Sequence, residues 1–232
     1  KELILIDAGS GNTLGPTMGQ TVRNIILSGY KPENINKILI THAHPDHVNG
    51  LTVDGKMIYP NATVYLNKAD YDFWIKVTQD LKKTLEPYMK KNQCIFFKDG
   101  DKITDGVKII SLPGHSVGHT GYEVTSNNEK LLFWGDIIHD ADVQFLNMNV
   151  ETVMGKYDEE RVTQEINMAK DIVNKVVNEK KLIAGAHLSF PGIGHVIKNK
   201  SDTDYRFIPI HYNELKWDGN PSEKYVQRPW KW

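Results

Sequence analysis

Residues 41–47 read THAHPDH, a short stretch in which metal-ligand types of side chain are concentrated. It places three imidazoles and one carboxylate within six residues, directly after the apolar run at 38–40. A strand that ends in a tight turn would direct all four side chains into one pocket, where ligands of this kind bind zinc, iron(II) or manganese. Because the chain has nine histidines in 232 residues, solvated loop histidines are a poor explanation for this cluster.

Four further ligand-type side chains lie at or near the ends of other apolar runs. They are His115 and His119 in the segment PGHSVGHT at 113–120, Asp136 after the run at 131–135, and His187 after the run at 182–186. β-Like runs that deliver such side chains at their carboxyl ends are expected to meet at one edge of a sheet. The sequence therefore predicts a metal site assembled from several strand ends.

This order of motifs resembles the metallo-β-lactamase fold: HxHxDH, then Gly-His at 118–119, Gly-Asp at 135–136 and a last histidine after a strand. Four shorter segments are similar to the branch that contains methyl parathion hydrolase and related lactonases. They are GPT at 15–17, DFW at 72–74, ADVQF at 141–145 and HLSFPGIGH at 187–195. The resemblance runs from about residue 3 to residue 210. It implies an α/β protein with a four-layer αβ/βα sandwich.

The resemblance also implies a centre of two divalent cations with seven ligands. Carried over position by position, the first cation is assigned His42, His44 and His119, the second Asp46, His47 and His187, and Asp136 bridges the two. Zn²⁺ is the expected metal, with Mn²⁺, Co²⁺ or Fe²⁺ as alternatives, because nitrogen and oxygen sites bind these ions with overlapping preference. Asp46, His47 and Asp136 are thereby also assigned to catalysis.

Two cations close together lower the pKa of a shared water, so that a bridging hydroxide becomes the nucleophile near neutral pH. The residues favour no other nucleophile. The chain has no G-x-S-x-G motif, and its single cysteine, Cys94, lies in the apolar stretch CIFF, where a core thiol is expected. Together with the resemblance to the lactonase branch, this implies a hydrolase that opens a carboxylic ester, foremost a lactone such as an N-acyl-homoserine lactone.

Residues beside the metals are assigned less directly. Asp7, at the tip of the first strand, is expected to accept a hydrogen bond from the HxHxDH loop or to cap its own turn. His115 matches no ligand of the pattern and is assigned a role beside His119, while His195 is expected to make a structural hydrogen bond. The candidate substrate residues are Leu14, Phe73, Trp74, His139 and Phe145.

His139 and Leu14 depart from the phosphotriesterase branch, where we expect an apolar and an aromatic residue; this favours a more polar substrate. Three alternatives stay open: a phosphotriester hydrolase, a hydroxyacyl-glutathione thioesterase, and a non-catalytic binding module, which would have no reason to keep seven ligands. A net charge of −1 gives no basic groove for nucleic acid, so the expected partner is a small molecule.

Length and composition, 232 residues of which 40% are apolar, predict a single domain over residues 1–232. The sequence has no run of 18 apolar residues, so it predicts no membrane-spanning helix. The chain starts directly with a strand, whereas proteins of this resemblance carry further strands upstream. We therefore expect a native N-terminal segment to be missing, and with it an export signal, so that an exported or periplasmic location is favoured over a cytoplasmic one.

The aromatic tail at 212–232, with Trp217, Trp230 and Trp232, is expected to pack either on the domain or on a second subunit of a homodimer.

Apolar periodicity predicts alternating strands and helices. Strands are expected at 3–6, 35–40, 63–66, 107–112, 121–125 and 130–134, with a hairpin turn at 126–129. One helix is expected to open with a capping box of Thr17 and Gln20 and to bury Met18, Val22, Ile25 and Ile26. A second helix is expected over 68–79, and the Asp/Lys-rich stretch that follows, up to Asn92, is assigned no element. The longest helix is expected to start near Asp158 and to bury Val162, Ile166, Ala169, Val173 and Val176.

Overall fold

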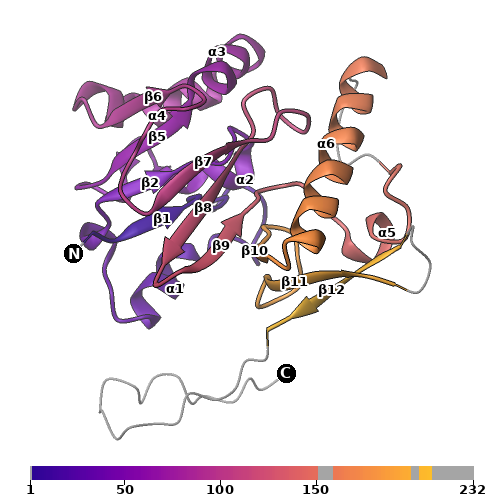
Figure 1. Cartoon of the computed structure of the whole chain (residues 1–232). Coiled ribbons are helices and arrows are strands. Elements are labelled where there is room, and N and C mark those ends of the chain that lie inside the picture. Colours follow the sequence, from indigo (N-terminus) through magenta and orange to yellow (C-terminus); the bar gives the residue numbers. More distant parts are fainter. Residues whose placement is uncertain (1, 151–158, 200–203, 211–232) are drawn as a thin grey trace, which may run out of the picture.

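Two β-sheets lie next to each other, and helices cover the outer face of each (Figure 1). The computed structural model describes residues 2–150, 159–199 and 204–210. One sheet has four strands in the order β1-β2-β5-β6, all parallel. The other has six strands in the order β12-β11-β10-β9-β8-β7, in which only the β9–β10 pair is parallel.

The four-stranded sheet consists of β1 (Ile4–Ile6), β2 (Lys37–Leu39), β5 (Thr63–Asn67) and β6 (Cys94–Phe97). The six-stranded sheet consists of β7 (Val107–Ser111), β8 (Thr120–Ser126), β9 (Glu129–Phe133), β10 (Leu182–Ala184), β11 (Ile193–Lys198) and β12 (Tyr205–Pro209). A small hairpin joins β3 (Thr52–Val53) to β4 (Lys56–Met57). The helices are α1 (Thr21–Leu27), α2 (Pro45–Val48), α3 (Lys68–Val77), α4 (Asp80–Lys90), α5 (Ala141–Gln144) and α6 (Glu159–Asn178), with 3-10 turns η1 (Pro32–Asn34) and η2 (Asn49–Leu51).

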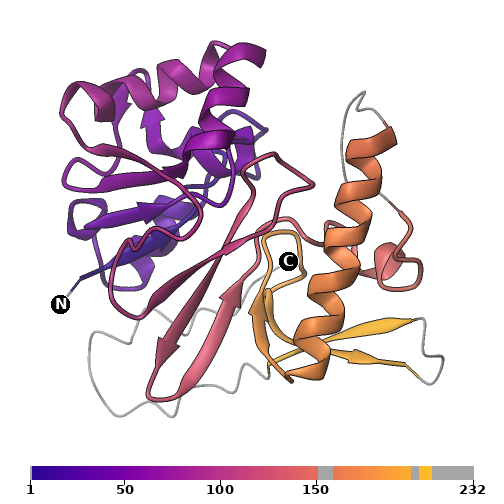
Figure 2. The same ribbon diagram turned by 45° about the horizontal axis from the view of Figure 1, so that its top comes forward.

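Three apolar clusters hold the layers together. Leu39, Phe97 and Tyr122 fill the space between the two sheets. A second cluster packs α4, through Leu81 and Leu85, on the outside of the four-stranded sheet. The third packs α6 on the outside of the six-stranded sheet, and Figure 2 shows this helix flanking β10 and β11. The order is therefore helix, sheet, sheet, helix, which confirms the expected four-layer αβ/βα sandwich.

Strand direction brings the ligand-type residues together. β1, β2 and β5 run parallel, so the segments after their carboxyl ends share one edge of their sheet. β9 and β10 are the parallel pair of the other sheet, so Asp136 and His187, which follow them, also lie near each other. Thr120 N–H donates to the carbonyl of Thr41 at 2.9 Å and joins the two sheets at this edge. The functional edge thus contains loops from both halves of the sandwich.

The β8–β9 hairpin confirms the turn expected at 126–129. Asn127 and Asn128 both have positive φ, 49° and 66°, as a two-residue turn with a right-handed strand twist requires. Asparagine tolerates this region better than most residues do.

The first helix differs from the expectation. α1 begins at Thr21, its N-cap residue Gln20 makes no side-chain capping bond, and none of its residues is fully buried. Met18 and Ile26 are exposed instead of facing inward. The cause is Gly19, whose φ is +72° and whose absent Cβ would lie 2.3 Å from the carbonyl oxygen of Gly11. The chain turns against that loop first, so the helix starts later than Thr17 and presents a different face.

The stretch up to Asn92, which was assigned no element, forms the helix α4. Its buried residues, Leu81, Thr84, Leu85 and Tyr88, recur at helical spacing, a signal that the surrounding lysines hid.

In α6 the buried residues are Glu165, Ala169, Ile172, Val173 and Val176. Val162 and Ile166 are only half-buried, so the expected inward face was wrong over the first two turns. Asp158 lies outside the described residues. No helix among the described residues is both long and apolar enough to cross a membrane.

Candidate metal centre

The HxHxDH stretch divides into an extended half and a helical half. β2 ends at Leu39, and His44 has extended backbone angles as the N-cap residue of α2. Pro45 occupies the first helical position, where its fixed φ favours helix initiation and its missing N–H costs nothing. His42 therefore projects from the segment between β2 and α2 and His44 from extended backbone, whereas Asp46 and His47 project from the first turn of α2.

The first group of potential ligands consists of His42, His44, His115 and Asp136, and one donor atom from each lies within 4.8 Å of all the others. Nε2 of His115 lies 3.0 Å from Nδ1 of His44 and 3.2 Å from Nε2 of His42. Three imidazole nitrogens facing one another at this range form a cradle for a cation.

The second group consists of Asp46, His47, Asp136 and His187, again with donor atoms within 4.8 Å. Nε2 of His187 lies 3.0 Å from Oδ2 of Asp136 and 3.4 Å from Oδ2 of Asp46. Nε2 of His47 lies 3.2 Å from the same Asp136 oxygen. Asp136 belongs to both groups, so its carboxylate lies between two potential cation sites.

The surroundings of Asp136 show that these residues fit divalent cations. Its Oδ2 atom lies within 3.6 Å of ring nitrogens from five histidines, which are His42, His47, His115, His139 and His187. Its Oδ1 atom is buried and has no hydrogen-bond partner among the described residues. A buried carboxylate oxygen without a partner is costly, and a coordinated cation would satisfy it.

The pKa values differ between the two groups. Burial lowers the pKa of His42 well below its ordinary value, and burial together with the nearby His115 lowers that of His44 to about 3. Hydrogen bonds to Asp136 and Asp46 instead raise the pKa of His187 to about 9. At neutral pH His42 and His44 therefore present free lone pairs, whereas His187 carries a proton that a cation would have to displace.

His119 is not where the resemblance placed it. Its Nε2 atom accepts a hydrogen bond from the backbone N–H of Asp136 at 3.1 Å, and its Nδ1 atom lies 3.2 Å from the carbonyl oxygen of Leu112. Both ring nitrogens are engaged by backbone, so neither can bind a cation. His115, which was expected to play a supporting role, takes that position in the first group. His119 therefore lies outside both groups of potential ligands among the described residues.

Asp7 holds the HxHxDH loop in place through hydrogen bonds to its carboxylate. Its carboxylate accepts hydrogen bonds from the N–H of Thr41 at 2.7 Å, from the Thr41 hydroxyl at 2.8 Å and from Nδ1 of His47 at 2.8 Å. The last bond directs the other nitrogen of His47 toward Asp136.

Asp70, on α3, is a supporting residue that the sequence did not reveal. Its carboxylate accepts hydrogen bonds from the N–H of Ala43 at 2.6 Å, from the N–H of Gly118 at 3.0 Å and from the hydroxyl of Ser116. It thereby ties the HxHxDH loop to the loop that contains His115. The available signal was its position just after β5, at the same sheet edge as the ligand-type residues.

Two of the expected substrate residues lie at the cluster. The ring of Trp74 meets that of His44 edge-on at 4.8 Å, and its Nε1–H donates to the hydroxyl of Ser116 at 3.1 Å. Nε2–H of His139 donates to Oδ2 of Asp136 at 2.8 Å, and the His139 ring lies 4.2 Å from that of His187. Both residues can therefore contact a ligand held at this centre.

The other three expected substrate residues lie elsewhere. Phe145 is buried in the apolar core that packs α6 on the six-stranded sheet. Phe73 packs against Trp74 and beneath the guanidinium of Arg161, which lies 4.8 Å from its ring centroid. Leu14 is exposed in the loop after β1.

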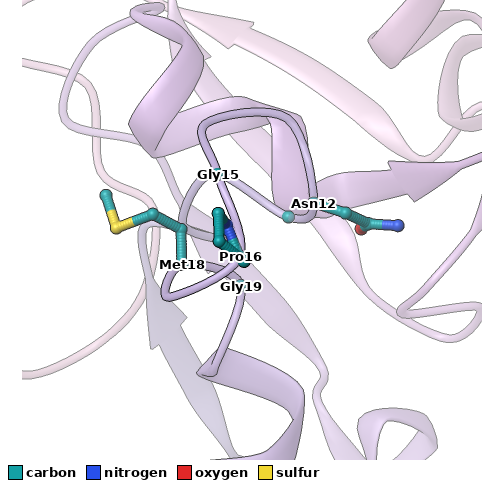
Figure 3. A pocket seen from close by; sticks show the side chains of 6 residues that line it. Asn12, Gly15, Pro16, Met18 and Gly19 are labelled. Atoms are coloured by element: carbon teal, nitrogen blue, oxygen red, sulfur yellow. The ribbon is translucent and has the colours of Figure 1, made fainter.

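That loop encloses a cavity of about 380 Å³, lined by Gly11, Asn12, Gly15, Pro16, Met18 and Gly19. Figure 3 shows the side chains of Asn12 and Met18 pointing in opposite directions from it. Neither Leu14 nor any residue of the two ligand groups lines this cavity, so it gives no support to a substrate role for Leu14.

Cys94 does not take part in the centre. It is half-buried on β6, and burial raises the pKa of its thiol to about 12, which excludes a thiolate near neutral pH.

Comparison with known proteins gives consistent relatives. An N-acyl homoserine lactonase of Bacillus cereus is 27% identical over 160 residues, 68% of this chain and 58% of that protein. The chain thus spans little more than half the length of this curated relative. The crystal structure of hydrolase AbOPH in the beta lactamase superfamily has a TM-score of 0.83 and 33% identity, covering 92% of this chain and 77% of that one.

The structure of AidC, a dizinc quorum-quenching lactonase, has a TM-score of 0.81 and 22% identity over the same shares, and shows the same fold. Residues 1–149 match the metallo-beta-lactamase superfamily. The match covers well over half of the 232 residues and includes both the HxHxDH stretch and Asp136. The chain therefore belongs to the metallo-beta-lactamase superfamily.

Proposed function

We propose that this protein is a dinuclear metal-dependent hydrolase that opens carboxylic esters, foremost an N-acyl-homoserine lactone. One observation carries the proposal: two groups of potential ligands share the carboxylate of Asp136, whose second oxygen has no other described partner. Such a shared, buried carboxylate suits two adjacent cations better than one.

The residues that would hold the first cation are His42, His44 and His115, and those that would hold the second are Asp46, His47 and His187, with Asp136 common to both. When bound, two such cations supply an activated water as the nucleophile and polarise the ester carbonyl. Nitrogen and oxygen donors in this ratio suit Zn²⁺, and Mn²⁺, Co²⁺ or Fe²⁺ can bind the same set.

The residues of the chain define how a substrate would approach. The side chains of His42, His47 and His115 are at most 3% exposed, whereas those of His139 and His187 keep 25% and 34% of their surface. The substrate would therefore enter on the side of His139 and His187. There the ring of His139, whose Nε2 is hydrogen-bonded to Asp136, would form a polar wall, while Trp74 forms an apolar wall beside His44.

A lactone is the preferred substrate for two reasons. The Bacillus cereus relative is an N-acyl homoserine lactonase. In addition, the half-buried polar ring of His139 suits a substrate rich in carbonyl and amide oxygens better than it suits an apolar aryl phosphotriester.

Phosphotriester hydrolysis is the second candidate, because attack on phosphorus needs the same parts. Turnover of N-decanoyl-homoserine lactone and of paraoxon by one metal-loaded preparation distinguishes the two. We expect kcat/KM to be far higher for the lactone and both activities to disappear with a chelator. A large excess for paraoxon would reverse the order of the two candidates.

Metal content tests the centre itself. We expect about two divalent ions per chain, as two complete ligand groups predict. A preparation that binds less than one ion per chain, or that keeps its activity after chelation, would favour a non-catalytic binding module instead.

A further inference from the structure

We propose that Glu165 of α6 is a positioning residue that orients the imidazole of His115 toward the first cation. The inference rests on the proposed function, because it gives a role to a ring that we place in the metal centre. Glu165 is buried although it is acidic, whereas the other four buried residues of α6 are apolar: Ala169, Ile172, Val173 and Val176. Acidic side chains are rarely buried unless they have a defined partner.

The partner of Glu165 lies on the loop between β7 and β8. Oε1 of Glu165 lies 3.5 Å from Nδ1 of His115, and the two side chains are only 6% and 2% exposed. The opposite ring nitrogen of His115, Nε2, faces His42 and His44 at 3.2 and 3.0 Å. The ring thus lies between the carboxylate on one side and the other ligands of the first group on the other side.

Backbone packing fixes this approach. A Cβ atom at Gly114 would lie 2.7 Å from Cα and 3.2 Å from the backbone nitrogen of Glu165, so only glycine lets the loop rest directly on the helix. His115 is the next residue, and it is therefore held at the point where α6 presents Glu165. The contact is built into the fold and does not depend on the rotamer of a long, exposed side chain.

The chemistry of the pair explains why an acid is placed there. A carboxylate near Nδ1 favours the tautomer that carries its proton on that nitrogen, and it holds the ring so that the lone pair of Nε2 points into the cluster. An apolar residue at 165 would extend the core of α6 and leave the ring free to rotate or to change tautomer. Asp7 supports His47 in the same manner, so each ligand group contains one imidazole whose second nitrogen faces a carboxylate.

Zinc affinity is the test, measured on the full chain by competition with a chromophoric chelator. We expect Glu165→Met, which keeps the side-chain volume but removes the acceptor, to lower the affinity for one of two zinc ions by about 10- to 100-fold. Glu165→Gln keeps an acceptor oxygen and should stay close to the unchanged chain. With Co²⁺ in place of zinc, E165M should alter the visible absorption of one site only.

A matched control separates positioning from stability. Val173→Ala removes two methyl groups from a fully buried position of the same helix, away from the site, and should destabilise the fold without changing either zinc affinity. If E165M does not fold, Glu165→Asp serves instead, because it withdraws the carboxylate from His115 by one methylene.

Unchanged zinc affinities and cobalt spectra in E165M and E165D would overturn the inference and leave the proposed function intact. An unchanged chain that binds no zinc would overturn the proposed function, and with it this role of Glu165.

Discussion

Nδ1 of His47 donates a hydrogen bond of 2.8 Å to Oδ2 of Asp7, a residue 40 positions earlier in the chain. Because this bond directs Nε2 of His47 toward Asp136, we expect Asp7→Asn to lower the affinity for the second cation by about 10- to 100-fold. The amide can still accept from Thr41, so the fold should survive. Zinc titration of the variant, followed by chelator competition, measures the effect.

Asp54→Asn is the matched control for that substitution. Asp7 and Asp54 both have a positive φ, 56° and 50°, which asparagine tolerates, but Asp54 is exposed in the β3–β4 turn. Zinc affinity should not change in D54N, and an equal loss in both variants would contradict a specific role of the Asp7 carboxylate.

His115 and His119 should behave in opposite ways when each is replaced by alanine. H115A should lose about one of two bound metals, because it removes a donor from the first group. H119A should keep both metals but lose about 2–4 kcal/mol of unfolding free energy, since it leaves the N–H of Asp136 without its acceptor and opens a cavity. Elemental analysis and urea unfolding of the two variants measure these effects; the reverse pattern would restore His119 as the ligand.

The metal-free protein should become less stable as the pH rises past neutrality. Hydrogen bonds to Asp136 and Asp46 raise the pKa of His187 from 6.5 to about 9. Because the pKa of His187 is higher in the folded state, protonated His187 stabilises the folded state fully below about pH 6.5, and this stabilisation is lost as the pH rises through about 9. Melting temperatures in chelator should therefore fall over this interval, and less steeply in H187Q.

His195→Gln is the control for that pH series, because His195 is exposed and lies outside both ligand groups. Its melting curve should follow that of the unchanged chain. Metal affinity at the second site should rise over the same interval, as protons cease to compete for His187. Identical pH slopes in H187Q and the unchanged chain would contradict the assignment.

Removal of the Asp70 carboxylate should destabilise the fold more than removal of an exposed acid on the same helix. Asp70→Ala leaves the N–H groups of Ala43 and Gly118 and the hydroxyl of Ser116 without their acceptor, at a cost of about 3 kcal/mol or more. Asp72→Ala breaks only a half-exposed ion pair with Lys68 and should cost about 0–1 kcal/mol. Urea unfolding compares the two, and equal losses would exclude the bracing role of Asp70.

The family, the sheet edge and most of the donor atoms could be predicted from the amino-acid sequence. Six of the seven expected ligands belong to the two groups because the HxHxDH spacing and the parallel strand ends constrain where they lie. The hairpin at Asn127 and Asn128 was likewise determined locally, since its turn depends on only a few residues. Such features are set by short-range geometry, which one sequence displays directly.

The choice between His115 and His119 could not be predicted, because it depends on contacts across the fold. His115 follows Gly114 and His119 follows Gly118 in one short loop. Which of the two rings faces the other ligands depends on the helix against which each glycine packs. Gly114 packs on Glu165 of α6, and a Cβ at Gly118 would lie 2.6 Å from the backbone nitrogen of Asp70. These contacts join segments far apart in the chain. They also explain why Asp70 and Glu165 were missed, because a buried acid is recognised only when its partner across the fold is known.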